Sequence, residues 1–122
     1  MNSIKQPWID LGYRIFAFEG PLGLKVERLA KGVGKNKSSF YHHFADLEVF
    51  TTYLLEHYIE QAKILAKKES ECEIIEDFID VIIEHGNDLL FNRQLRIHRE
   101  NEQFAACFAK VNELSVPEIV AA

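Results

Sequence analysis

The side chains with the most chemistry at close spacing lie in one nine-residue stretch, Asn-Lys-Ser-Ser-Phe-Tyr-His-His-Phe, which ends at Phe44. At about 100° per residue, a helix here places Phe40 and Phe44 on one face. The opposite face then carries Ser38, Ser39 and His42. The aromatic face is suited to docking the helix, whereas the polar face presents short hydrogen-bonding groups outward.

The two flanks of this predicted helix carry Tyr41 and His43. The surrounding stretch is the most basic part of an acidic chain, with five cations against Glu27 alone between residues 25 and 43: Lys25, Arg28, Lys31, Lys35 and Lys37. Residues 1–50 hold seven Lys/Arg against five Asp/Glu, whereas residues 51–122 hold seven against fourteen, for a net charge of −5. A local excess of positive charge is the pattern expected where a protein contacts phosphates.

Small hydroxyls and an imidazole suit the edges of DNA bases, and a phenol, a second imidazole and ammonium groups suit phosphate oxygens. The predicted DNA-contacting residues are therefore Lys25, Lys35, Asn36, Lys37, Ser38, Ser39, Tyr41, His42 and His43. For Tyr41 and His43 taken singly, the alternative is that they only cap and cover a small helical bundle.

Four helices are expected to position these residues. The first carries an apolar stripe at helical spacing, made of Trp8, Leu11, Gly12, Ile15 and Phe16, and ends at Gly20-Pro21. A second short helix follows, with a glycine-containing turn before the polar stretch. The fourth begins after Asp46 as N-cap and runs to about Lys68.

Residues 8 to 60 resemble the DNA-binding domain of TetR-family transcriptional regulators. The matching residues are Ile15-Phe16, Gly20, Val26, Leu29-Ala30-Lys31, Ser39 to Phe44 and Glu48. The resemblance implies an all-α fold: a three-helix DNA-binding domain with a helix-turn-helix over residues 1–50, joined by a long fourth helix to a helical effector-binding and dimerisation region over residues 51–122. It also implies a ligand-responsive repressor that binds double-stranded DNA, at a palindromic operator, as a homodimer.

Two positions depart from the family pattern. Leu24 stands where members usually have Thr or Ser, so a side-chain cap and phosphate contact at the start of the second helix are missing. Leu47 stands where Lys is usual, which removes a second backbone contact. Both departures weaken the expected phosphate contacts and leave the base-reading face unchanged, so we expect DNA binding of modest affinity.

The second region is expected to be incomplete, because family members continue through further helices. Helices are predicted from Ile75 to Phe91 and from Gln94 to about Leu114, with Pro117 beyond the end. Candidate effector-binding residues for an unknown small molecule are Phe78, Phe91, His98, Phe104 and Phe108. The alternative is that they are ordinary core residues. Three arginines, Arg93, Arg96 and Arg99, are expected to pair with the acidic residues of the preceding helix rather than with a ligand.

Other classes of function find little support in the sequence. No histidine has Glu three residues before it, and there is no paired-cysteine zinc spacing or phosphate-binding glycine loop. We therefore expect no enzyme activity, metal or cofactor. The sequence also lacks a signal-peptide pattern and an apolar run of membrane-spanning length, so a cytoplasmic protein without membrane contact is expected. The remaining alternative is a helical protein-interaction module that has lost DNA binding.

Overall fold

The computed structural model describes the backbone of residues 4–121 and the side chains of residues 4–114. The expected all-α class is confirmed for this part of the chain, which contains helices and no strand. The elements are α1 (Gln6–Glu19), the 3-10 turn η1 (Pro21–Gly23), α2 (Val26–Val33), α3 (Lys37–His43), α4 (Leu47–Ser70), α5 (Ile75–Glu84), α6 (Gly86–Ile97) and α7 (Glu102–Ala121). Met1 to Ser3 and Ala122 lie outside the described residues.

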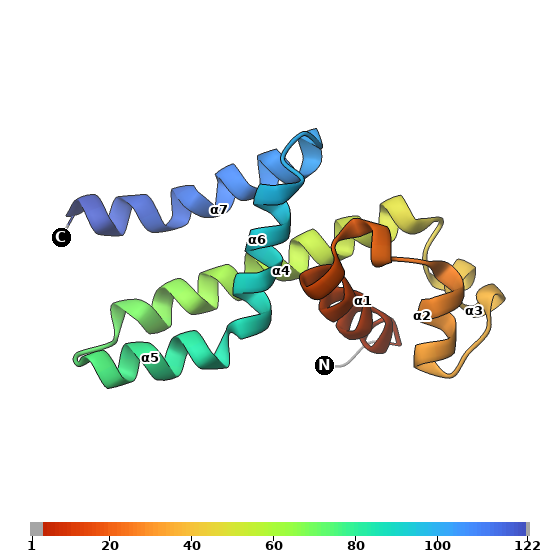
Figure 1. Ribbon diagram of the computed structural model, residues 1–122, viewed down its shortest axis with the longest axis horizontal. Coiled ribbons are helices and arrows are strands. Elements are labelled where there is room, and N and C mark those ends of the chain that lie inside the picture. The colour runs from red at the N-terminus through yellow and green to blue at the C-terminus, as the bar shows by residue number, and fades with distance from the viewer. Residues whose placement is uncertain (1–3, 122) are drawn as a thin grey trace.

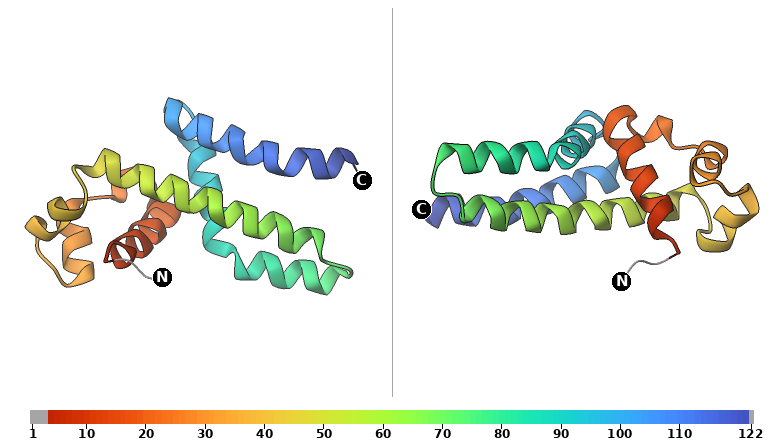
Figure 2. Two further views of the ribbon diagram at one scale, coloured as in Figure 1. Left: turned by 180° about the vertical axis from the view of Figure 1, so that it is seen from behind. Right: turned by 90° about the horizontal axis from the view of Figure 1, so that it is seen from below.

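The long helix α4 runs through the middle of the molecule (Figure 1). The short helices α2 and α3 lie at its N-terminal end, and α5 folds back along its C-terminal half. Helix α6 crosses α4. Helix α7 then runs beside the C-terminal half of α4 (Figure 2). The most extensive packing between two helices joins α1 to α6, so the first helix contacts both halves of the chain.

The predicted ends of α1 and α4 are confirmed. Gly20 ends α1 with φ 80°, a left-handed conformation that favours glycine, and a Cβ there would lie 2.7 Å from Oε1 of Gln94. Asp46 caps α4, because its Oδ1 accepts a hydrogen bond of 2.8 Å from the backbone nitrogen of Val49. These local signals set where α1 ends and where α4 begins.

The second half differs from the sequence prediction in three places. The helix expected from Ile75 to Phe91 is broken at His85, so α5 and α6 are separate helices that meet at a bend. The helix expected from Gln94 is broken at residues 98–101, where Asn101 caps α7 by accepting a 3.1 Å hydrogen bond from the nitrogen of Phe104. Helix α7 also continues past Leu114 to Ala121, with Pro117 inside its bounds and not beyond its end.

One hydrophobic core extends through both halves of the chain. Phe91 of α6 is fully buried and stacks on Phe16 and Tyr13 of α1, with ring centroids 4.3 and 4.5 Å away, and on Tyr58 of α4, 5.0 Å away. Phe104 of α7 packs edge-on against Phe16. These ring contacts therefore join α4, α6 and α7 to α1.

A buried polar network adjoins this stack. The hydroxyl of Tyr13 donates to Oδ1 of Asp88 at 2.5 Å, and Nδ1 of His85 lies 2.7 Å from the other carboxylate oxygen. Lys68 donates to Nε2 of His85 at 3.1 Å and pairs with Glu84 at 2.6 Å. Burial, followed by the bond to Asp88, raises the pKa of Tyr13 well above its usual value. The hydroxyl therefore stays protonated and acts as a donor that ties α1 to α6.

Within the described part of the chain, no helix combines the length and apolarity needed to cross a membrane.

The crossing of α1 and α4 yields a stability prediction. A Cβ on Gly12 would lie 2.4 Å from the ring of Phe50, which is fully buried, whereas a Cβ on Gly86 meets nothing within 4 Å. We expect Gly12→Ala to lower the free energy of unfolding by about 1–3 kcal/mol, and Gly86→Ala to leave it unchanged or raise it by up to about 1 kcal/mol. Urea unfolding of the two variants measures both, and equal stabilities would contradict this packing.

Candidate nucleic-acid interface

Aromatic packing holds α3 against the rest of the molecule. Phe40 is fully buried, with its ring centroid 5.7 Å from that of Trp8 and 5.6 Å from that of Phe50. Phe44 packs edge-on against Phe50, with centroids 4.8 Å apart. The predicted docking face of this helix is therefore buried.

The turn before α3 has two defined elements. Gly34 ends α2 in the left-handed region, with φ 79° and ψ 32°. Asn36 caps α3, because its Oδ1 accepts a 2.9 Å hydrogen bond from the backbone nitrogen of Ser39. Its oxygen is thus already engaged in the folded chain, and the amide nitrogen is the group of Asn36 left for a ligand.

The outward face of α3 is open. Ser38, Tyr41 and His42 are exposed, and their side chains make no hydrogen bond to another described residue. Ser39, predicted on the same face, is half-buried instead. The rings of Tyr41 and His42 contact Phe40 and His43, but the polar atoms of all three side chains can approach a ligand without first breaking a hydrogen bond inside the protein.

His43 lies at the edge of this face. It is half-buried, with its ring centroid 6.4 Å from that of Trp8. Burial, with smaller contributions from His42 and Lys5, lowers the pKa of His43 below its usual value. The imidazole of His43 therefore holds a proton less readily than a fully solvated histidine does.

The cations around α2 and α3 divide into two groups. Arg28 forms a bidentate pair with Glu19, and Lys37 lies 3.1 Å from Glu27. Both pairs are solvent-exposed and so contribute little to stability. Lys25, Lys31 and Lys35 are exposed and make no ion pair among the described residues. Part of the positive charge counted in the sequence is thus balanced locally, and three cations remain free for an anion.

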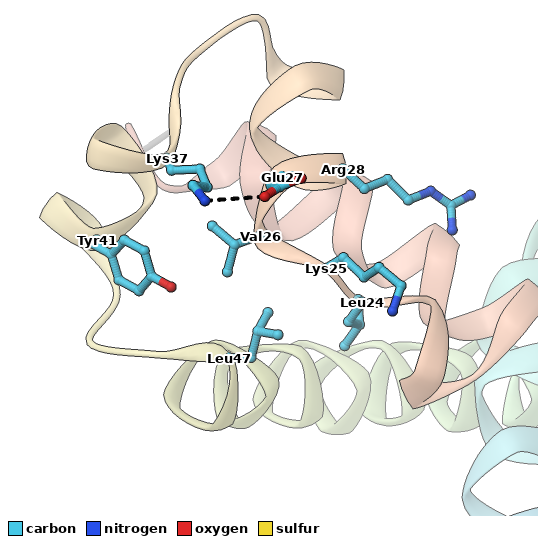
Figure 3. Close-up of a pocket in the computed structure, with 8 residues that line it drawn as sticks. All are labelled: Leu24, Lys25, Val26, Glu27, Arg28, Lys37, Tyr41 and Leu47. Carbon is cyan, nitrogen blue, oxygen red and sulfur yellow. Dashed lines mark hydrogen bonds and ion pairs between the residues drawn. The ribbon is translucent and has the colours of Figure 1, made fainter.

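An open groove lies between the start of α2, the side of α3 and the start of α4 (Figure 3). Its volume is about 610 Å³, and it is lined by Leu24, Lys25, Val26, Glu27, Arg28, Lys37, Tyr41 and Leu47. The start of α2 has no side-chain cap, as the sequence predicted, but the N-cap residue is Lys25 and not Leu24. Leu24 and Leu47, the two departures from the family pattern, both line this groove.

The predicted effector residues do not line a common cavity in the part of the chain that the structure describes. Phe91 and Phe104 are buried in the core, and Phe108 is partly buried against it. His98 lies 3.7 Å from Glu100, and Phe78 is 39% exposed on α5. Their assignment to an effector therefore stays a prediction.

Sequence reasoning missed a different cavity, of about 180 Å³, between α4, α6 and α7. Asn92 donates a 2.7 Å hydrogen bond to the Tyr58 hydroxyl beside it, and burial raises the pKa of Tyr58 to about 12. Its lining mixes apolar residues with polar ones, among them Glu69, Asp88 and Asn112, so no apolar stripe in the sequence pointed to it. No group of three or more His, Cys, Asp or Glu side chains among the described residues is arranged to hold a metal ion.

The cap of α3 can be tested separately from any DNA contact. Asn36→Ala removes the acceptor for the Ser39 nitrogen and is expected to cost about 1 kcal/mol of unfolding free energy. Asn36→Asp keeps an acceptor at the same place and should retain the stability of the parent chain. Chemical unfolding measures the free energy of unfolding of both variants. An Asp variant as unstable as the Ala variant would show that the cap contributes nothing to stability.

Comparisons with models of protein families, with curated proteins and with solved structures found no match to this chain.

Proposed function

We propose that this chain is a DNA-binding regulator of transcription of the TetR type, in which α3 enters the major groove of an operator. Two copies would bind a palindromic site, with their α3 helices about 34 Å apart. Its proposed role is that of a ligand-responsive repressor.

The observation that carries the proposal is the two-sided character of α3. Its inner face is fixed by Phe40 and Phe44, whereas Ser38 and His42 are exposed and have no hydrogen-bond partner among the described residues. A reading helix needs both properties, because its position must be rigid and its polar groups must be free to bond to base edges.

The flanks of α3 supply groups suited to phosphates. The hydroxyl of Tyr41 points into the groove beside the uncapped start of α2, close to Lys37 (Figure 3). The open backbone donors of a helix N-terminus favour an anion. We assign Tyr41, His43, Lys25 and Lys35 to the DNA backbone, and Lys37 to the same role once it exchanges Glu27 for a phosphate.

Regulation would pass through α1 and α4. A ligand bound among α4, α6 and α7 would change the position of α6, and α6 is tied to α1 by Phe91 and by the bond from Tyr13 to Asp88. A shift of α1 or α4 would alter the separation of the two α3 helices and release DNA.

Selection of bound sequences from a random pool of duplex DNA tests the proposal. We expect a palindrome to be recovered, and His42→Ala to lose it while retaining the parent unfolding curve. Lys35→Ala should weaken the affinity for all DNA sequences alike. It should also reduce the steepness with which log K falls with log salt concentration by about 1. Lys110→Ala, an exposed lysine on α7, is the matched control and should change neither.

Two outcomes would contradict the proposal. One is retention of no duplex by the folded parent chain at low salt. The other is retention that His42→Ala, Tyr41→Ala and Lys35→Ala leave unchanged. Either result would favour a helical protein-interaction module instead.

The lowered pKa of His43 predicts a pH dependence of DNA affinity. A phosphate beside the imidazole favours its charged form, so binding would be coupled to uptake of a proton. Affinity should therefore rise as the pH falls from 8 to 6, by at most about tenfold per unit for one proton. Fluorescence anisotropy at several pH values measures this. His43→Gln should flatten the profile, and an unaltered profile in that variant would remove His43 from the phosphate contact.

A further inference from the structure

The arginines of α6 do not pair with the acidic residues of the preceding helix, although the sequence predicted that they would. Arg93, Arg96 and Arg99 form no ion pair among the described residues. The guanidinium of Arg99 bonds to a backbone carbonyl, and that of Arg96 bonds to the side chain of Asn92. Arg96 therefore acts on a neighbour within its own helix.

This contact begins a short chain of hydrogen bonds that leads to the cavity between α4, α6 and α7. Nε of Arg96 donates to Oδ1 of Asn92 at 3.2 Å, and Nδ2 of Asn92 donates to the hydroxyl oxygen of Tyr58 at 2.7 Å. A guanidinium can only donate, so it fixes which end of the Asn92 amide faces Arg96 and which end faces Tyr58. The hydroxyl of Tyr58 must therefore be an acceptor in its bond to Asn92.

The hydroxyl hydrogen of Tyr58 is left without an acceptor among the described residues. Burial raises the pKa of Tyr58 to about 12, so the hydroxyl keeps this hydrogen at neutral pH. The side chain is only 3% exposed, and buried donors in proteins are nearly always paired. The unused hydrogen therefore marks a place for an acceptor from outside the chain.

The cavity beside this hydroxyl has room for a small molecule. Tyr58 and Asn92 both line it, its volume is about 180 Å³, and its walls come from the three helices that lie together in Figure 2. A cavity of about 150 Å³ is enough to hold benzene. The apolar part of the lining consists of Ala62, Leu65, Leu89 and Val111. An apolar body the size of a substituted benzene ring therefore fits this space.

The charges of the lining decide between classes of ligand. Glu69 and Asp88 line the cavity, whereas no lysine, arginine or histidine of the described chain does, so an anion is disfavoured. The carboxylate of Asp88 is already engaged by Tyr13 and His85 and offers little to an ammonium group. An ammonium group also has no lone pair to accept the hydrogen of Tyr58. The remaining class is a neutral molecule that carries an acceptor.

We propose that this cavity binds a small neutral molecule with an apolar body and a carbonyl oxygen, and that the carbonyl accepts the hydroxyl hydrogen of Tyr58. The inference rests on the proposed function, which places a ligand among α4, α6 and α7, and it adds the chemical class of that ligand and the group that recognises it. Arg96 and Asn92 are positioning residues, because they act on the ligand only through the orientation of Tyr58.

Nuclear magnetic resonance of the isotope-labelled full chain, titrated with acetophenone in the absence of DNA, tests the proposal. Saturable shifts are expected at the amides of Ala62, Leu89 and Val111, with a dissociation constant of about 0.1–1 mM. Benzoate and benzylammonium are charged probes of similar size, and each should bind at least about tenfold more weakly.

Tyr58→Phe separates the hydrogen bond from the apolar fit, because it keeps the ring that stacks on Phe91. It should weaken acetophenone about fivefold or more. It should not weaken cumene, which has the shape of acetophenone without the carbonyl. Tyr53→Phe is the matched control: Tyr53 packs against Phe44 and lies outside the cavity lining, so the affinity for both probes should stay unchanged.

Three results would overturn the proposal. The first is the absence of saturable shifts around the cavity in the parent chain, which would leave only water beside Tyr58. The second is binding of benzoate or benzylammonium as tight as that of acetophenone. The third is a Tyr58→Phe variant that binds acetophenone as well as the parent does, or that weakens acetophenone and cumene equally.

These failures are distinct from failure of the proposed function. Since DNA is absent, a cavity that binds no probe leaves DNA reading by α3 untouched. A parent chain that binds acetophenone through Tyr58 but retains no duplex DNA would count against the proposed function alone.

Discussion

The stack of Phe91 on Tyr13, Phe16 and Tyr58 is the contact on which the rest of this structure depends. Helices α2 and α3 are too short to hold their positions alone, and they are fixed against α1 and the start of α4. The stack in turn fixes α1 and α4 against α6. Removing the ring of Phe91 would therefore disturb the position of α3 from a distance, although Phe91 lies far along the chain from α3.

The same region also places an acidic side chain, Asp88, in the protein interior. Asp88 accepts from Tyr13 and lies against His85, so a buried carboxylate is stabilised by groups from α1 and from the end of α5. Such a network has few alternative arrangements, because the loss of any one partner leaves a buried polar group without its hydrogen bond. It makes the position of α1 relative to α6 well defined.

Local signals in the sequence were enough to place the end of α1 and the start of α4, because Gly20 and Asp46 act on their own neighbours. The helical class and the burial of Phe40 and Phe44 also follow from spacing. The breaks at His85 and at residues 98–101 were missed, since the apolar period continues across both. The orientation of α5 could not be derived from its pattern, which says which side is apolar but not that Lys68 holds the acidic side. For the same reason, Arg93 and Arg96 were expected to find partners within the chain.

The central claim is that the outer face of α3 is the surface that meets DNA. The most direct measurement is nuclear magnetic resonance of the isotope-labelled chain, titrated with duplex DNA at low salt. The account predicts that the largest shifts appear at the amides of Ser38, Tyr41 and His42 and at the start of α2, with α5 and α6 little changed. Shifts confined to α5 and α6, or none at any ratio of DNA to protein, would contradict it.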